Sequence, residues 1–131
     1  MEFYATSFFA VAFGRTTDAI LNIKYDLYGY IEEGYQWLGI FGQYLIYITI
    51  SMLYLNYFPY ERNLLLKTLY IAGWTIFSII FEKISLLTHF FYYHHWSLWI
   101  SAFIYPILFV ILVLNLLFVK WLIKLPYKNK A

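Results

Sequence analysis

The chain has 131 residues, of which 63% are hydrophobic and 12% are charged, and it contains no cysteine. A soluble domain is typically about 45–50% apolar and about 25% charged, and a chain this short cannot hide such an excess of apolar surface from water. The composition therefore excludes a water-soluble domain and predicts an integral membrane protein. The absence of cysteine excludes disulfides and thiol chemistry, and a net charge of +2 does not indicate nucleic-acid binding.

Four apolar stretches are long enough to cross a bilayer core about 30 Å thick, which requires about 20 helical residues. We predict an all-α bundle of four transmembrane helices that forms one domain. The predicted spans are 3–23, 35–57, 64–87 and 98–123. The first is interrupted by Arg15 and Asp18, the second stops near Pro59, and Pro106 inside the fourth is an expected kink.

Lysine and arginine predict the orientation, because short basic loops are retained on the cytoplasmic side. The second connection and the C-terminal tail contain Arg62, Lys67, Lys120, Lys124, Lys128 and Lys130. The first and third connections contain only Lys24 and Lys83. Both termini are therefore expected in the cytoplasm, in a multi-pass protein of the cell membrane.

Polar residues of the four predicted spans lie at a similar depth in the membrane. At about 1.5 Å of rise per helical residue, the outer half of the bilayer holds Arg15, Asp18, Asn22, Gln43, Ser78, Glu82 and Tyr105. The inner half is almost entirely Leu, Ile, Phe and Val. Because ionisable groups within a membrane point into the bundle or into a wet cavity, we predict that these residues form an outward-facing ligand-binding pocket above an apolar floor.

A structural role for the same residues is an open alternative. Arg15 and Asp18 lie three residues apart on one helix and can reach one another, and polar pairs can hold transmembrane helices together. Glu82 and Lys83 are also compatible with the outer end of the third span, with both side chains reaching water.

Enzyme signatures are absent from the sequence. It contains no P-loop, no G-x-S-x-G and no dinucleotide fingerprint. His89, His94 and His95 do not have the spacing of a metal-binding motif. We therefore predict a non-enzymatic protein with no catalytic residue, cofactor or metal site.

Further motifs are spread over nearly the whole chain. They are Gly14-x-x-Thr17-Asp18, Lys24-Tyr25-Asp26-Leu27-Tyr28-Gly29-Tyr30, Leu55-Asn56-Tyr57-Phe58-Pro59-Tyr60, Trp74-x-x-Phe77 with Glu82, Phe91-Tyr92-Tyr93 with Trp96-x-Leu98-Trp99, and Ile104-Tyr105-Pro106. Together they resemble a family of small, uncharacterised multi-spanning membrane proteins of spore-forming Bacilli and Clostridia. The resemblance implies a membrane location and architecture but no activity. It also implies that an additional apolar segment can precede the region that matches Phe3.

Three functions are compatible with the sequence. The first is a membrane component that binds a small ligand, a lipid headgroup or a partner helix in the polar pocket, with Arg15 facing an anionic group. The second is a small proton-coupled transporter in which Glu82 or Asp18 changes its protonation. The third is an enzyme acting on a lipid, with one of these carboxylates and a histidine as acid and base. The expected partners are the lipid bilayer and either another membrane protein or a second copy of the chain.

Overall fold

A computed structural model describes residues 2–30 and 36–128. The described elements are α1 (Glu2–Ala19), a π-helical turn (Ile20–Lys24), β1 (Tyr28–Tyr30), α2 (Gln36–Asn56), α3 (Leu64–Leu87), β2 (Phe91–Tyr93) and α4 (Leu98–Lys128). The four α-helices account for most of the described chain, which confirms the predicted all-α class.

Two described helices are long and apolar enough to cross a membrane, Leu64–Leu87 and Leu98–Lys124. α4 continues past the predicted end at residue 123 and runs through Pro106 without a break. The first predicted span corresponds to α1 and its π-helical turn, and the second corresponds to α2. Residue 35 of that span and Lys130 of the predicted basic tail lie outside the described residues.

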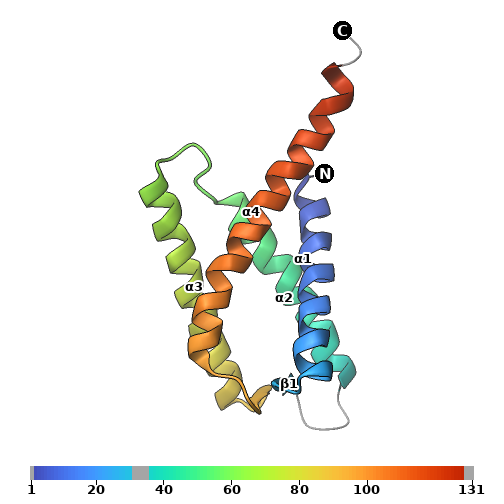
Figure 1. Cartoon of the computed structure of the whole chain (residues 1–131), viewed down its shortest axis with the longest axis vertical. Helices are drawn as coiled ribbons and strands as arrows, with labels where there is room; N and C mark the ends of the chain where they lie inside the picture. Colours follow the sequence, from blue (N-terminus) through green and yellow to red (C-terminus); the bar gives the residue numbers. More distant parts are fainter. Residues whose placement is uncertain (1, 31–35, 129–131) are drawn as a thin grey trace.

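The four helices run alternately in opposite directions (Figure 1). The start of α1, the α2–α3 connection and the end of α4 lie at one end of the bundle, which we call the tail end. β1 and β2 lie at the opposite end, the strand end. α1 packs against α2 and α4, whereas α3 packs against α4 and β2.

Residues that start or stop helices lie at the ends of several helices. Pro59 follows α2, where its missing N–H prevents the helix from continuing. Asn63 caps α3 by accepting a hydrogen bond of 3.1 Å from the backbone N–H of Leu66. At the strand end, Asp26 and His89 adopt φ values of 49° and 56°, the left-handed conformation in which many helices terminate.

Two short strands connect the loops of the strand end. β1 and β2 pair antiparallel, with Tyr28 opposite Tyr93, and His94 Nδ1 lies 3.3 Å from Asp26 Oδ2 beside them. The sequence does not predict these strands, because three residues are too few to show the alternation that identifies a strand. The pairing fixes the connection after α3 against the connection after α1.

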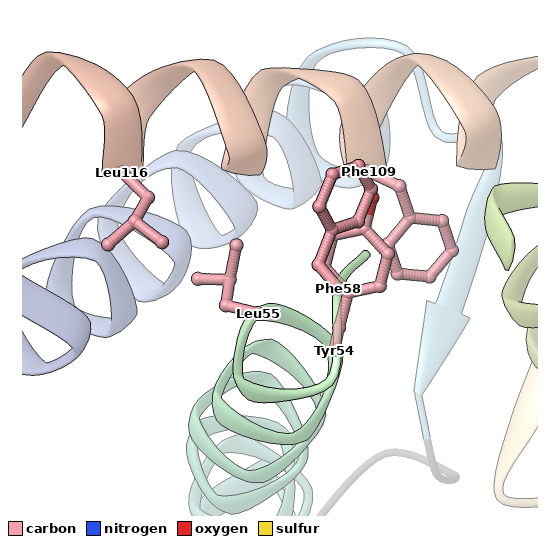
Figure 2. Packing of buried hydrophobic residues seen from close by; sticks show 5 residues of the cluster. All are labelled: Tyr54, Leu55, Phe58, Phe109 and Leu116. Carbon is pink, nitrogen blue, oxygen red and sulfur yellow. The ribbon is translucent and has the colours of Figure 1, made fainter. Parts of the chain in front are cut away.

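Aromatic rings fill the tail end between α2, α3 and α4. We call this cluster the aromatic core, and it contains Tyr54, Phe58, Tyr70, Trp74 and Phe109. The ring of Tyr54 is its centre, with a centroid distance of 4.6 Å to the ring of Phe109. Beside these rings, Leu55 of α2 and Leu116 of α4 face one another (Figure 2).

The distribution of side chains is the reverse of that in a soluble domain. Buried polar side chains in the described part are Thr6, Ser7, Asp18, Gln43, Ser51, Thr75, Ser78, Glu82 and Ser101. Large apolar side chains are exposed on all four helices, including Phe8 (71% exposed) and Phe103 (75% exposed). In water each such side chain would forgo about 25 cal/mol per Å² of unburied apolar surface. The bundle therefore buries polar side chains beside its aromatic core and has an apolar outer surface.

Candidate functional site

A cavity of about 250 Å³ lies between the four helices, between the strand end and the aromatic core. Each helix contributes one face, because lining residues recur three or four positions apart. In α1 and the π-helical turn that follows it, these are Ala10, Phe13, Gly14, Thr17, Asp18 and Leu21. Phe, Leu and Ile make up ten of the 23 described lining residues, and the walls also include the carboxylates of Asp18 and Glu82.

Glu82 of α3 accepts hydrogen bonds from three hydroxyl groups although it is only 6% exposed. Tyr105 Oη lies 2.5 Å from Oε2, and Ser101 Oγ lies 2.8 Å from Oε1. Tyr93 Oη also donates to Oε1. Two donors come from α4 and one from β2, so the network forms only when α3, α4 and the strand pair are assembled.

Trp96 sets the direction of this network. An indole N–H can only donate, and Trp96 Nε1 lies 2.8 Å from Ser101 Oγ. The Ser101 oxygen therefore accepts from Trp96 and directs its own proton to Glu82. Burial, followed by the hydrogen bond to Glu82, raises the pKa of Tyr93, so Tyr93 keeps its proton at neutral pH. Three O–H donors on one carboxylate suit its ionised form.

Asp18 of α1 is the second acidic group of the cavity wall. It is 8% exposed, and Tyr47 Oη of α2 donates to its Oδ2 at 2.6 Å. The ring of Tyr47 can lie here because Gly14 has no side chain, since a Cβ at Gly14 would be 2.9 Å from Tyr47 Cζ. Gly14 thus allows α1 and α2 to approach closely.

Five predicted site residues line the cavity, namely Asp18, Gln43, Ser78, Glu82 and Tyr105. Arg15 lies outside it, where its guanidinium donates to Gln43 Oε1 and its Cζ is 5.7 Å from the ring centre of Tyr44. Arg15 thus contacts the cavity wall through Gln43 but does not itself line the cavity. The site predicted for Arg15, Asp18 and Glu82 together is therefore formed without Arg15.

Asn22 also lies outside the cavity. It belongs to the π-helical turn Ile20–Lys24, where i→i+5 hydrogen bonds change the register of the helix. Leu21 lines the cavity in its place. The prediction for Asn22 rests on its depth in the outer half of the first span, and depth alone does not fix the direction in which a side chain points.

The sequence-based prediction did not include Tyr47, Tyr93, Trp96 or Ser101 among the site residues. Tyr47 follows Gln43 by four positions, and this spacing places the two on one face of α2. Tyr93 and Trp96 lie in a connection without helical periodicity, and aromatic rings in such segments usually mark the membrane interface. Only the pairing of β1 with β2 brings Tyr93 to Glu82.

Positive charge is missing from the described part of the cavity wall. Among the side chains that the structure describes, no lysine, arginine or histidine lines the cavity. Glu82 has hydroxyl partners and forms no ion pair with any described residue. Its charge is therefore stabilised by hydrogen bonds and not by a basic side chain of this part of the chain.

Comparison of the chain with protein-family models, curated proteins and solved structures finds no match. The resemblance to the membrane-protein family of Bacilli and Clostridia therefore stays a prediction. The function has to be argued from the cavity and its surroundings.

Proposed function

We propose that the protein is a four-span membrane protein that binds a small ligand, without catalysis, in the cavity between its helices. The observation that carries this proposal is Glu82, a buried carboxylate held by three hydroxyl groups at the wall of a cavity of about 250 Å³. Burying an ionised group costs several kcal/mol unless it is paired. A purely structural role would favour a basic partner on a neighbouring helix, whereas here the carboxylate borders space that a ligand can enter.

The side-chain distribution supports membrane insertion. An apolar outer surface and buried polar side chains match a lipid environment, where polar groups are satisfied inside the bundle. α3 and α4 are long and apolar enough to span, and the 21 residues of α2 correspond to about 31 Å of helix. α1 and its π-helical turn would form the remaining span, with Arg15 and Asp18 turned toward polar partners.

The distribution of basic residues supports an outward-facing cavity. Arg62, Lys67, Lys120 and Lys124 belong to the tail end, whereas Lys24 and Lys83 belong to the strand end. Short basic loops are retained in the cytoplasm, so the tail end and both termini would be cytoplasmic. The cavity would then lie in the outer half of the membrane.

A proton-coupled transporter is the second candidate, because the carboxylates of Asp18 and Glu82 line one cavity. A transport path would need polar lining toward the tail end as well. The tail-end side of the described cavity is instead mainly apolar, with Ala10, Ile50 and Leu112 in its lining and the hydroxyl of Ser51 as an exception, which favours binding over passage. Flux into proteoliposomes that disappears in Glu82→Gln would favour the transporter.

Calorimetric titration tests the binding function with three probes of similar size, the 2-phenylethylammonium cation, neutral 2-phenylethanol and the phenylacetate anion. The protein is held in phosphatidylcholine nanodiscs, and heats from empty nanodiscs are subtracted. We expect at least one probe to bind the wild type, and Ser78→Phe to abolish this binding by filling the cavity. Ile76→Phe is the matched control, because Ile76 lies on α3 but is exposed on the outer surface.

Binding of none of the probes to a folded wild type would contradict the proposal. Binding that survives in Ser78→Phe would contradict it as well, because the probe would then lie elsewhere. Thermal unfolding monitored by circular dichroism establishes that both variants fold.

A further inference from the structure

We infer that the ligand of this cavity is an organic cation, a protonated amine joined to a small apolar group. The inference rests on the proposed function, that the cavity binds a small ligand, and adds the charge class of that ligand. It depends on the acceptor geometry of Glu82, on the charges around the cavity, and on the size and composition of its walls.

Glu82 has an acceptor position available for a ligand. An ionised carboxylate offers about four lone-pair positions. Oε1 receives hydrogen bonds from Tyr93 and Ser101, and Oε2 receives one from Tyr105. One position on Oε2 is left, and an ammonium N–H can donate to it.

The charge balance favours a cation. A buried charge is expensive unless it is paired, and Glu82 has no ion pair with a residue of the described ranges. Arg15 does not line the cavity itself, and its guanidinium donates to Gln43, a residue of the cavity wall. A positively charged ligand would supply the missing charge, whereas an anionic ligand would meet the carboxylate of Glu82 without a compensating base.

The cavity walls indicate the size of the ligand and the apolar character of the part that carries the ammonium group. Phe13, Phe81, Phe90, Trp96 and Phe109 line the cavity, and aromatic rings attract both apolar groups and cations. A dry engineered cavity of roughly 150 Å³ holds benzene. The cavity of about 250 Å³ therefore has room for one ring, a short chain and an ammonium group.

The same three probes test the charge class. We expect the wild type to bind 2-phenylethylammonium at least about tenfold more tightly than 2-phenylethanol, which is the effect of one charge-assisted contact, and phenylacetate most weakly. Glu82→Gln should reduce the affinity for the ammonium probe to that of the alcohol and leave the alcohol nearly unchanged. Glu61→Gln is the matched control, because Glu61 is exposed in the α2–α3 connection, and it should bind all probes like the wild type.

A second variant keeps the test informative if Glu82→Gln does not fold. Ser78→Lys introduces an ammonium group four residues before Glu82, on the same face of α3. If Glu82 lacks a cation, this internal amine should raise the unfolding temperature and abolish binding of the ammonium probe. A lower unfolding temperature in a protein that still binds the probe would overturn the inference.

Other outcomes separate this inference from the proposed function. The ammonium and alcohol probes could bind with equal affinity, unaffected by Glu82→Gln, and both could lose binding in Ser78→Phe. This result would overturn the inference that the ligand is a cation, but it would support the binding cavity. If phenylacetate binds most tightly, the inference of a cationic ligand is likewise overturned and the binding cavity is retained. Binding of no probe would contradict both.

The amine can come from a free molecule or from a lipid headgroup. We expect a free amine, because the cavity walls enclose a volume suited to one ring. Replacing part of the phosphatidylcholine by phosphatidylethanolamine should then leave the affinity for 2-phenylethylammonium unchanged. Competition by phosphatidylethanolamine would overturn the expectation of a free amine, and it would identify the ligand as the amine of a lipid headgroup.

Discussion

In the tail end, rings from α2, α3 and α4 fill the space between the helices, with Tyr54 and Phe109 at a centroid distance of 4.6 Å. Toward the strand end, the same helices leave a cavity of about 250 Å³. Hydrogen bonds among buried side chains, above all those to Glu82 and Asp18, connect the helices there.

For the proposed membrane bundle, the difference separates two ways of joining helices. Lipid tails are as apolar as leucine, so helices associate through close packing or through interhelical hydrogen bonds. The aromatic core joins the helices by packing of rings. The strand end uses directed hydrogen bonds, which hold α3, α4 and β2 together around an open volume.

The largest expected effect concerns the centre of the aromatic core. Tyr54 is fully buried, so Tyr54→Ala should reduce the free energy of unfolding by about 3 kcal/mol or more. Tyr54 Oη has no hydrogen-bond partner among the described residues, so Tyr54→Phe should be neutral or stabilising by about 1 kcal/mol. Thermal unfolding in detergent measures both variants, and equal destabilisation by the two would show that the hydroxyl, and not the packing, matters.

At the strand end, Tyr105→Phe removes the hydroxyl that donates to Glu82 Oε2. Because hydrogen bonds to charged groups are strong, the variant should lose about 2 kcal/mol of stability and bind the ammonium probe less tightly. Tyr57→Phe is the control, since Tyr57 is exposed at the tail end. Comparable losses in the two variants would mean that the network contributes nothing specific.

Substitution of two glycines by alanine tests the close approach of α1 and α2. In Gly14→Ala the added methyl group would lie 2.9 Å from Tyr47 Cζ, so Tyr47 must move from Asp18 and stability should fall by about 1 kcal/mol. In Gly73→Ala the methyl group meets nothing within 4 Å, and the better helix propensity should raise stability by up to about 1 kcal/mol. Changes of the same sign in urea unfolding would refute the close contact.

The smallest effect is expected at the exposed contact between Asp26 and His94. Asp26→Asn removes the charge and keeps a residue that tolerates a positive φ. Exposed pairs of this kind contribute about 0–1 kcal/mol, so the unfolding temperature should hardly change. A loss as large as that in Tyr105→Phe would show that this contact, together with the strand pair, holds the strand end closed.

Much of this arrangement follows from helical periodicity. The third predicted span, 64–87, coincides with α3, and the spacing of Ser78 and Glu82 places both on one face of that helix. Depth along the helices also brings Asp18 and Glu82 to the same cavity. These features depend on the regular geometry of single helices, which can be predicted from one sequence.

Non-local contacts could not be predicted in the same way. Arg15 and Asp18 are close on α1, yet their partners Gln43 and Tyr47 lie on α2, and the helix contact selects these pairs. The π-helical turn moves Asn22 out of the cavity. Tyr93 reaches Glu82 only because two strands of three residues pair across the chain.

Labelling of single cysteines most directly tests whether the cavity opens outward and the apolar surface faces lipid, because the chain contains no cysteine of its own. Ser78→Cys places a thiol at the cavity wall, and Phe103→Cys places one on the outer surface of α4. A membrane-impermeant trimethylammonium methanethiosulfonate, added outside intact cells, should modify Ser78→Cys rapidly and Phe103→Cys slowly, and 2-phenylethylammonium should protect the first. Rapid modification of Phe103→Cys with an inert Ser78→Cys would contradict both the orientation of the side chains and the cavity as a binding site.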